Sequence, residues 1–505
     1  MLKSKVSFSL YILGISVLNL LLFHLPFFRF VFNNIDCRTF NGSLLTFSLL
    51  IMTLVANFFA FYMLLFRAGI VGRILMCIFF VINAVALYFI NTYGVIIDES
   101  MIGNVLNTNY SESSSFFSFQ LLGYLILFGL VPCYFILTVL VVKESAKRCL
   151  IIFLGSLVCM LVFVFANSSN WLWIDKNSKT LGGLVMPWSY TVNTSLFYLH
   201  QHQSNEKEIQ LPSATITNNE KAVVVLVIGE SARKDNFSLY GYGKNTNPLL
   251  SKTDNVHTFL ANSCATYTTA GVKCILQHQD TSDLYEILPN YLYRNNVDVV
   301  WRTTNWGEPP VHIKDYQTQE KLVTGCKGAN CDYDEVLVST LKERIISSSH
   351  NKILIVLHTS TSHGPTYSKK YPKQFEVFGP VCNSVELSKC SQQELINAYD
   401  NTIVYTDYLL SRVIGELKEL KGYRSSMIYV SDHGESLGEN KLYMHGLPIS
   451  LAPKQQYEIP FIVWSSGGPS IKSNRSVSQN YVFHSVLRFL SIRSPIYNEK
   501  MSVFK

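Results

Sequence analysis

VVVLVIGESAR, residues 223–233, is the stretch that decides the fold of the second half of this chain. An unbroken apolar run rich in β-branched residues predicts a strand that is buried on both faces, as in parallel sheets. The run stops at Gly229 and Glu230. It therefore places a carboxylate at the carboxyl end of a central strand, where open α/β sheets bind their ligands. We expect Ser231 to cap a helix that follows.

A second strand of this kind ends in acidic and imidazole groups. Residues 426–431 read SMIYVS and run directly into Asp432 and His433. One acidic strand end is weak evidence, because a helix cap looks much the same. Two such ends, one of them with a histidine, indicate a divalent-cation site whose ligands suit zinc. We therefore predict that Glu230, Asp432 and His433 meet around a metal ion.

The first third of the chain is strongly apolar. Five stretches approach or exceed the ~17–25 residues that a helix needs to cross a bilayer. They are 9–32, 44–66, 70–91, 120–142 and 149–166. The first is too long for a removable signal peptide and lacks a small-residue cleavage site. We predict a transmembrane domain of five helices over residues 1–166.

Basic residues set the expected orientation of these helices. They gather in loops on one side of the predicted spans, at Lys3, Lys5, Arg67, Arg73, Lys143, Lys147 and Arg148. The positive-inside rule makes that side cytoplasmic, so an odd number of spans delivers the rest of the chain to the outside. The net charge of +7 partly reflects these loops and does not indicate a nucleic-acid partner.

Cysteine usage supports this orientation. Six of the eleven cysteines form short-range pairs after the membrane part, Cys264 with Cys274, Cys326 with Cys331 and Cys382 with Cys390. Local pairs in an exported domain indicate three disulfides, each stapling a loop. Reduced thiols in a cytosolic domain would require every basic loop to face the wrong way.

The chain after the membrane part has two sections. Residues 167–218 form a connector of mixed polarity, in which 181–198 suit an amphipathic or interfacial helix. Short apolar strands then alternate with helices, which predicts one α/β domain over 219–505, with helices on both faces of a mostly parallel sheet. The predicted strands are 222–228, 297–301, 352–358, 426–431 and 459–464. Apolar spacings of three and four predict a long helix at 393–420.

A hydroxyl nucleophile would complete the metal site. Residues 262–270 contain Thr266, Thr268 and Thr269, and a divalent cation can lower the pKa of such a hydroxyl. The residues alone do not rank the three threonines, which in a surface loop are most often turn residues.

Histidines add to the candidate site. A lone loop histidine is usually solvent-facing or structural, but His363 and His445 both lie near predicted strand ends on the edge that carries the acidic residues. We assign both to the site. His358 lies inside a predicted strand, so we expect a packed core histidine there.

Several motifs, in order along the chain, resemble those of a known family. They are GESAR (229–233), YGY (240–242), TNP (246–248), SHGP (362–365), YDN (399–401) and SDHGESLGE (431–439). They are similar to those of the bacterial phosphoethanolamine transferases, which include lipid A-modifying enzymes and mobile colistin-resistance proteins. The resemblance covers essentially the whole chain. It implies five inner-membrane helices and then a periplasmic α/β/α sandwich of the alkaline phosphatase/sulfatase type.

The resemblance also assigns roles to residues. It implies zinc ligands at Glu230, Thr268, Asp432 and His433, with Thr268 as the nucleophile. His363 and His445 would bind the donor phosphate or a second zinc and assist the leaving group. In this family, polar residues in the outer loop between the third and fourth spans are linked to donor binding. The resemblance matches them to Asn104, Thr108 and Glu112.

Two positions depart from the family pattern. Many lipid A enzymes read Trp-Arg-Asp-Asn followed by a lysine where residues 301–310 read WRTTNWGEPP, and Lys273 stands where a proline is common. We assign Asn305, in the first of these segments, to substrate binding. Because both departures lie near the expected site, the resemblance leaves the acceptor open among lipid A, a core sugar and another envelope component.

The implied reaction is zinc-dependent transfer of phosphoethanolamine from phosphatidylethanolamine, through a phospho-threonine intermediate, to an envelope acceptor such as lipid A or lipopolysaccharide core. One zinc would be tightly bound, a second at His363 and His445 is left open, and we expect a monomer. One alternative is a glycerol-phosphate transferase of the lipoteichoic acid synthase type, against which the cysteine pairs argue. A catalytically silent membrane sensor is the other, and the intact ligand set argues against it.

Overall fold

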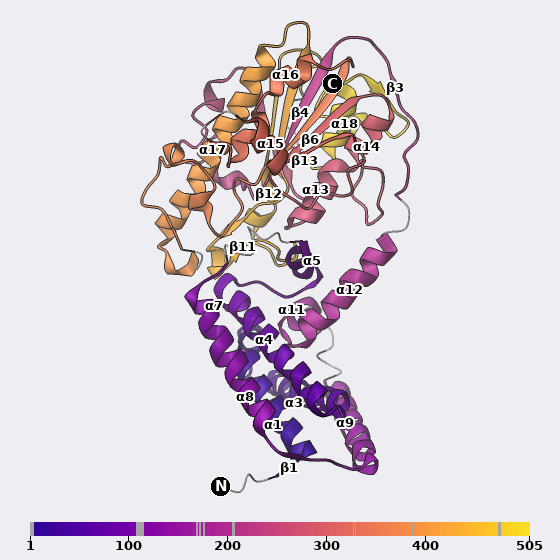
Figure 1. Ribbon diagram of the computed structural model, residues 1–505, viewed down its shortest axis with the longest axis vertical. Coiled ribbons are helices and arrows are strands. Elements are labelled where there is room, and N and C mark those ends of the chain that lie inside the picture. The colour runs from indigo at the N-terminus through magenta and orange to yellow at the C-terminus, as the bar shows by residue number, and fades with distance from the viewer. Residues whose placement is uncertain are drawn as a thin grey trace. The chain divides into compact units, whose positions relative to one another are not determined.

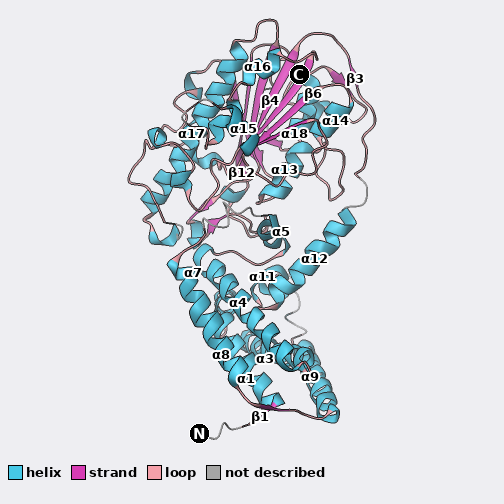
Figure 2. Ribbon diagram, viewed as in Figure 1, coloured by secondary structure: helices cyan, strands magenta, loops and turns pink. Residues whose placement is uncertain are grey.

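The structure is a computed structural model that describes residues 5–107, 116–167, 170, 173–174, 177–204, 208–326, 328, 330–384, 387–472 and 476–505. The chain forms two compact units. The first comprises Met1–Ile102 and Phe117–Tyr198, and the second Gly103–Phe116 and Leu199–Lys505. Helices dominate the first unit, and strands are concentrated in the second (Figure 2).

Apolar helices build the first unit. Four helical segments are long and apolar enough to cross a membrane: Phe40–Leu65 (α3), Gly69–Tyr93 (α4), Phe119–Thr138 (α7, a π-helical segment and α8) and Ala146–Ala166 (α9). A fifth is α1 (Phe8–Phe23) followed by α2 (Leu25–Asn34), bent by 61°. The predicted first span is thus a broken helix. Its break lies next to Pro26, which lacks the N–H that a continuous helix requires.

The predicted connector packs against helices of the first unit. It contains α11 (Ser178–Leu184) and the start of α12 (Trp188–Ser204). Asn19 Nδ2 donates to Met186 O at 2.9 Å, and Trp188 Nε1 donates to Asn57 Oδ1 at 2.7 Å. Because buried polar groups need hydrogen-bond partners, these bonds fix the start of α12 to α1 and α3.

An eight-stranded sheet forms the centre of the second unit, in the order β13-β5-β12-β9-β4-β8-β6-β7. The strands are β4 (Ala222–Gly229), β5 (Val256–Asn262), β6 (Asp298–Thr303), β7 (Asp315–Thr318), β8 (Lys352–His358), β9 (Arg424–Ser431), β12 (Glu458–Ser465) and β13 (Ser476–Ser478). From β9 to β7 all pairings are parallel, whereas β12 is antiparallel to β9 and to β5. The five predicted strands are all present, and the mostly parallel sheet is confirmed.

Short strand pairs complete the β structure. They are β1 (Val6–Ser7) with β2 (Val141–Val142), β3 (Thr215–Ile216) with β14 (Ile492–Arg493), and β10 (Ser436–Leu437) with β11 (Tyr443–Met444).

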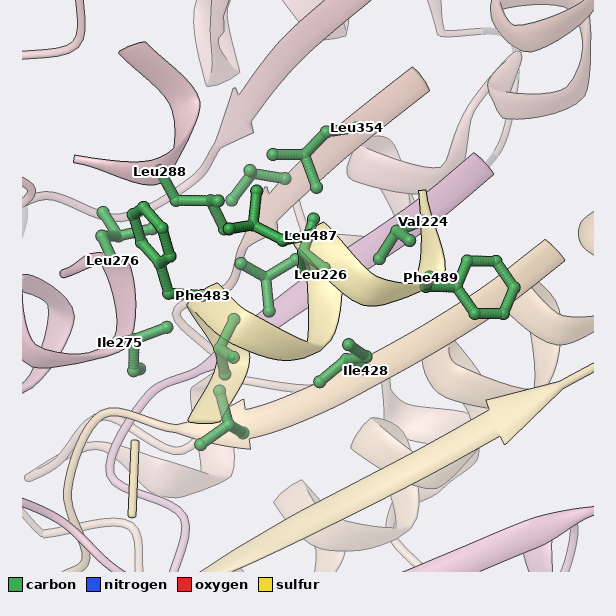
Figure 3. Packing of buried hydrophobic residues seen from close by; sticks show 14 of the residues in the cluster. Val224, Leu226, Ile275, Leu276, Leu288, Leu354, Ile428, Phe483, Leu487 and Phe489 are labelled. Atoms are coloured by element: carbon green, nitrogen blue, oxygen red, sulfur yellow. The ribbon is translucent and has the colours of Figure 1, made fainter. Parts of the chain in front are cut away.

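Helices cover both faces of the sheet (Figure 1). Every residue of β4 is buried, which requires cover on both sides because side chains alternate along a strand. One face packs against α13 (Thr268–Leu276), α14 (Leu288–Arg294) and α18 (Tyr481–Phe489), and Figure 3 shows Phe483 and Leu487 over the strands. The opposite face carries the long helix α17 (Gln392–Lys418) beside α16 (Leu341–Ile346). This arrangement confirms the predicted sandwich.

Two further predictions about local structure are confirmed. Helix α17 begins at a capping box formed by Ser391 and Glu394, and Gly422 beyond its end has φ +77°. The three disulfides are Cys264–Cys274, Cys326–Cys331 and Cys382–Cys390.

Candidate active site

Three of the predicted metal ligands meet at the carboxyl ends of neighbouring strands. Glu230 follows β4, and Asp432 and His433 follow β9. His433 Nε2 lies 3.3 Å from Glu230 Oε1 and 3.3 Å from Asp432 Oδ2. All three side chains are buried, and one donor atom from each lies within 4.8 Å of the others. The parallel register of β4 and β9 therefore brings Glu230 together with Asp432, which lies 202 positions later in the sequence.

Thr268 is the threonine that contacts this cluster. It is the first residue of α13, and its Oγ1 lies 3.3 Å from Glu230 Oε2 and 3.3 Å from His433 Nε2. Thr266 instead donates to the carbonyl of Leu447. No hydrogen bond from Thr269 to these side chains is found among the described residues.

A glycine allows α13 to lie against the backbone that follows β9. A Cβ added at Gly271 would lie 2.3 Å from Asp432 O and 2.8 Å from Asp432 C, both of which are backbone atoms. Gln479 Nε2 donates to the same carbonyl at 2.6 Å. The close approach of α13 thus sets the position of Thr268 relative to Asp432.

We expect Gly271→Ala to push α13 away from Asp432. Overpacking of this kind costs about 1–3 kcal/mol of folding free energy, and a displacement of about 1 Å at reacting groups lowers turnover on the order of 100-fold. Thermal unfolding and transfer assays measure the two effects. The matched control is Gly415→Ala on α17, where an added Cβ meets nothing within 4 Å, and it should leave transfer unchanged. Full activity of Gly271→Ala would show that this contact does not position Thr268.

The buried carboxylates of Glu230 and Asp432 require a compensating positive charge nearby. Burial raises the pKa of Asp432, and the charge of Glu230 raises it further, to about 7. Burial disfavours protonated His433, but the two carboxylates outweigh this effect and raise its pKa to about 10. With protein groups alone, a proton on His433 supplies the compensating charge, and a bound divalent cation would replace it.

The donor atoms fit zinc. Imidazole nitrogen and carboxylate oxygen are ordinary ligands of this ion. Asp432 Oδ1 accepts hydrogen bonds from Ser231 N at 3.0 Å and from His433 N at 2.6 Å. Asp432 Oδ2 is buried and accepts no hydrogen bond from the described residues, and the polar group near it is the fellow candidate ligand His433, whose Nε2 lies 3.3 Å away. A buried carboxylate oxygen normally has a partner, so this atom is suited to face a cation.

A second group of donors shares Glu230. Donor atoms of Glu230, His363 and His445 all lie within 4.8 Å of one another. The His445 ring centroid lies 4.2 Å from that of His433 and 5.6 Å from that of His363. The site therefore offers two overlapping sets of ligands, and His363 and His445 belong to the second.

Asn305 contacts a predicted zinc ligand. Its Nδ2 donates to Glu230 Oε2 at 2.7 Å and to Thr359 O at 2.9 Å. The same segment reaches the threonine, because a Cβ added at Gly307 would lie 3.2 Å from Thr268 Cγ2. The segment that departs from the family pattern thus lines the candidate site. His358 is fully buried as expected, and its Nε2 lies 3.4 Å from Asn305 Nδ2.

One of the three loop residues is described by the structure. Asn104 lies on α5 (Glu99–Asn107). A Cβ added at Gly446, the neighbour of His445, would lie 3.6 Å from Asn104 Nδ2. Thr108 and Glu112 lie outside the described residues.

The expectation that Ser231 caps a helix is wrong. The chain continues into a 3-10 turn at Lys234–Asn236, and Ser231 adopts φ +52°. Its Oγ donates to Glu230 Oε1 at 2.8 Å. The hydroxyl therefore holds a carboxylate of the site, and the left-handed backbone conformation directs Ser231 N to Asp432.

Sequence reasoning also missed Glu435 and Gln479. Glu435 is completely buried, and its Oε2 lies 3.4 Å from His445 Nδ1. Gln479 donates to the carbonyls of Ser431 and Asp432. The acidic character of SDHGE was a signal for Glu435, whereas Gln479 follows a short edge strand that carries no recognisable motif.

Family models match both parts of the chain. The Sulfatase model matches residues 222–492, and the model for Phosphoethanolamine transferase EptA/EptB matches residues 54–202. These two matches agree with the helical first unit and the α/β second unit.

Two similar curated proteins are named as phosphoethanolamine or phosphatidylethanolamine transferases. Phosphoethanolamine transferase EptA of Helicobacter pylori is 40% identical, over 96% of this chain and 94% of its own length. Phosphatidylethanolamine transferase Mcr-1 of Escherichia coli is 32% identical, over 76% of each chain.

Solved structures match the whole chain and the second unit. The integral membrane protein lipooligosaccharide phosphoethanolamine transferase A (EptA) from Neisseria meningitidis has a TM-score of 0.88 at 26% identity, covering 99% of both chains. The C-terminal periplasmic domain of phosphoethanolamine transferase EptC from Campylobacter jejuni is 36% identical with a TM-score of 0.52, covering 59% of this chain and 97% of that domain. The resemblance seen in the sequence motifs is therefore confirmed: the chain belongs to the phosphoethanolamine transferases, integral inner-membrane enzymes whose sulfatase-like catalytic domain lies in the periplasm.

Proposed function

We propose that this enzyme uses zinc to move phosphoethanolamine from phosphatidylethanolamine to lipid A or lipopolysaccharide core, through a phospho-threonine on Thr268. The observation that carries the proposal is the Thr268 hydroxyl, 3.3 Å from both Glu230 and His433 within a buried set of metal-ligand groups. No other threonine of that loop has these contacts among the described residues.

The metal part of the proposal rests on the donor set. Glu230, Asp432, His433 and Thr268 would hold one zinc, and Glu230, His363 and His445 offer a second set of ligands. When bound, zinc lowers the pKa of an alcohol and withdraws charge from phosphate oxygens. Asn305 and Ser231 hold the Glu230 carboxylate through hydrogen bonds of 2.7 and 2.8 Å.

The chain's own residues carry out two displacements at phosphorus. Thr268 Oγ1 gives its proton to water and attacks the donor phosphorus, the bond to the glycerol oxygen breaks, and that oxygen takes up a proton as diacylglycerol leaves. Burial lowers the pKa of His445, so its resting ring is neutral, and His445 is suited to relay this proton from water to the glycerol oxygen; Glu435, 3.4 Å from its Nδ1, stabilises the ring while it carries the proton. An acceptor hydroxyl then gives its proton to water and attacks the same phosphorus, the bond from phosphorus to Thr268 Oγ1 breaks, and Oγ1 takes up a proton from water.

We assign recognition of the donor headgroup to the outer loop between the third and fourth spans. Asn104 lies close to Gly446, next to His445, which supports a role beside the reacting phosphate. Thr108 and Glu112 follow Asn104 at intervals of four. We expect the Glu112 carboxylate to balance the ammonium charge of the ethanolamine headgroup, and we expect the working enzyme to be a monomer.

The names of relatives support the acceptor class. Kdo(2)-lipid A phosphoethanolamine 7''-transferase of Escherichia coli is 30% identical over 49% of this chain. These names and the phosphoethanolamine transferase family favour the proposed activity over a glycerol-phosphate transferase or an inactive sensor.

Mass spectrometry of lipid A and of core oligosaccharide tests the acceptor. Cells that express the chain should add one phosphoethanolamine group to one of these two fractions. Cells that express Thr268→Ala at the same level should not. Unmodified lipid A and core in the presence of active enzyme would contradict the proposed acceptor, while release of diacylglycerol in the same cells would leave the donor half of the proposal standing.

A further inference from the structure

Helix α17 contacts the turn that follows Glu230 through the hydroxyl of Tyr399. This residue belongs to the YDN motif, residues 399–401, which the proposed reaction does not use. Tyr399 is completely buried. Its hydroxyl donates to Ser231 O at 2.7 Å and accepts from Arg233 N at 2.9 Å. A single hydroxyl on α17 therefore spans the turn at the carboxyl end of β4.

The turn at Ser231 holds both carboxylates of the candidate site. Ser231 Oγ donates to Glu230 Oε1 at 2.8 Å, and Ser231 N donates to Asp432 Oδ1 at 3.0 Å. Ser231 makes these bonds from a left-handed backbone at φ +52°, a conformation that residues other than glycine rarely adopt. Strain of this kind persists only where the surrounding structure holds it. The Tyr399 hydroxyl is such a contact, because it bonds the turn on both sides of Ala232.

The neighbour of Tyr399 on α17 fixes the helix to the same part of the chain. Asp400 is completely buried and accepts hydrogen bonds from three residues of the segment that follows the turn. They are Asn236 at 2.6 Å, Tyr242 at 3.0 Å and Lys244 at 2.8 Å. The YDN motif thus bonds to the turn after β4 and to the YGY motif beyond it, and Tyr399 is held at a set distance from Ser231.

The polar groups that Tyr399 serves are shielded from water. Ser231 is completely buried, and Arg233 is 8% exposed. Burial raises the pKa of Tyr399 well above its usual value, so the phenol keeps its proton and donates it to Ser231 O. A buried carbonyl or N–H that loses its partner is costly. Loss of the hydroxyl should therefore shift the turn, and the groups that bond to Glu230 and Asp432 shift with it.

We propose that Tyr399 is a positioning residue for phosphoethanolamine transfer: its hydroxyl holds the Ser231 turn, and through that turn it orients the carboxylates of Glu230 and Asp432. This role rests on the proposed zinc-dependent function, because the two carboxylates would hold the metal. Groups that hydrogen-bond to metal ligands and orient them in this way set metal affinity and activity.

Tyr399→Phe tests the proposal, because it removes the hydroxyl and keeps the buried ring. Zinc affinity of the full chain in detergent, measured by competition with a zinc-selective chelator, should fall by about 10- to 100-fold. At saturating zinc, release of diacylglycerol from phosphatidylethanolamine should show kcat lowered by about 10-fold or more, with KM changed by less than about 2-fold. This split is expected because the carboxylates act on the reacting groups and not on the bulk of the donor.

Tyr291→Phe on α14 is the matched control. Tyr291 is also completely buried, and its hydroxyl donates to Pro212 O at 2.9 Å and contacts Ser494 Oγ at 2.7 Å. Both variants should lower the Tm of the metal-free protein, but Tyr291→Phe should keep normal zinc affinity and kcat. If Tyr291→Phe lost as much zinc affinity and kcat as Tyr399→Phe, lower stability would explain both variants and the proposal would be overturned.

Ser231→Gly provides a second test of the same role. Glycine adopts positive φ without strain, so the turn in this variant depends less on Tyr399. Tyr399→Phe should therefore reduce zinc affinity by a factor at least about 3-fold smaller in the Ser231→Gly background than in the unaltered chain.

Two results would overturn the positioning role: unchanged zinc affinity and kcat in Tyr399→Phe, or equal losses in the two backgrounds, which would show that Tyr399 does not act through the Ser231 turn. Failure of the unaltered, active chain to bind zinc would contradict the proposed function instead. In that case the kcat of Tyr399→Phe, compared between the two backgrounds, decides the positioning role by itself.

Discussion

Thr268→Ala should abolish transfer while leaving most of the bound zinc in place. The substitution removes the proposed nucleophile, and loss of such a group lowers turnover on the order of 10⁴-fold or more. Three protein ligands, Glu230, Asp432 and His433, remain for the metal. Release of diacylglycerol from vesicles of phosphatidylethanolamine measures the first effect, and elemental analysis of the purified protein measures the second.

Two neighbouring variants sharpen this experiment. Thr268→Ser retains a hydroxyl and should keep measurable activity. Thr269→Ala alters the next residue, for which no hydrogen bond to the ligand side chains is found among the described residues, and should behave like the unaltered enzyme. If Thr268→Ala retained a tenth of the normal rate, another group would have to be the nucleophile.

Asp432→Asn should have a comparable effect on activity, together with loss of zinc. The change preserves shape but removes the charge of a buried carboxylate whose Oδ2 has no hydrogen-bond partner among the described residues. Loss of a residue that only hydrogen-bonds to a metal ligand weakens metal affinity by up to about 100-fold. Loss of Asp432, a proposed direct ligand, should therefore weaken zinc affinity by at least about 100-fold. Competition with a zinc-selective chelator measures the affinity.

A buried aspartate away from the site provides the control. Asp407 on α17 is completely buried and accepts hydrogen bonds from Leu249 N and Leu250 N. Asp407→Asn should therefore reduce thermal stability but retain zinc and turnover per folded molecule. Normal zinc affinity in Asp432→Asn would remove this residue from the metal site.

Strong local patterns allowed the central strands, and the acidic and histidine residues at their carboxyl ends, to be predicted. Strand β4 is buried along its whole length and carries an unbroken apolar run, and β9 carries a shorter apolar run at 427–430, so the carboxyl ends of both strands are evident. In contrast, β5 has alternating exposure and β7 is only partly buried. A polar or half-exposed strand depends on its pairing partners for stability and carries a weak signal of its own.

The contacts that select Thr268 could not be read from the chain alone. Its distance to Glu230 depends on Gly271 packing against the Asp432 backbone, which is a property of the folded domain. The contact of Asn305 could not be read from the chain either, because its amide donates to Glu230 from a loop 75 residues away in the sequence. The family resemblance assigned Thr268 as the nucleophile, and the contacts of Thr268 with Glu230 and His433 give a physical reason for that assignment.

The central claim is that Thr268 carries the phosphoethanolamine group between donor and acceptor. The most direct measurement is mass spectrometry of peptides from enzyme that has reacted with phosphatidylethanolamine in the absence of acceptor. We predict the added mass of one phosphoethanolamine on the peptide that contains Thr268, with fragmentation locating it on that residue, and its absence from Thr268→Ala. An adduct on Thr266, on Thr269 or on a histidine would contradict the account.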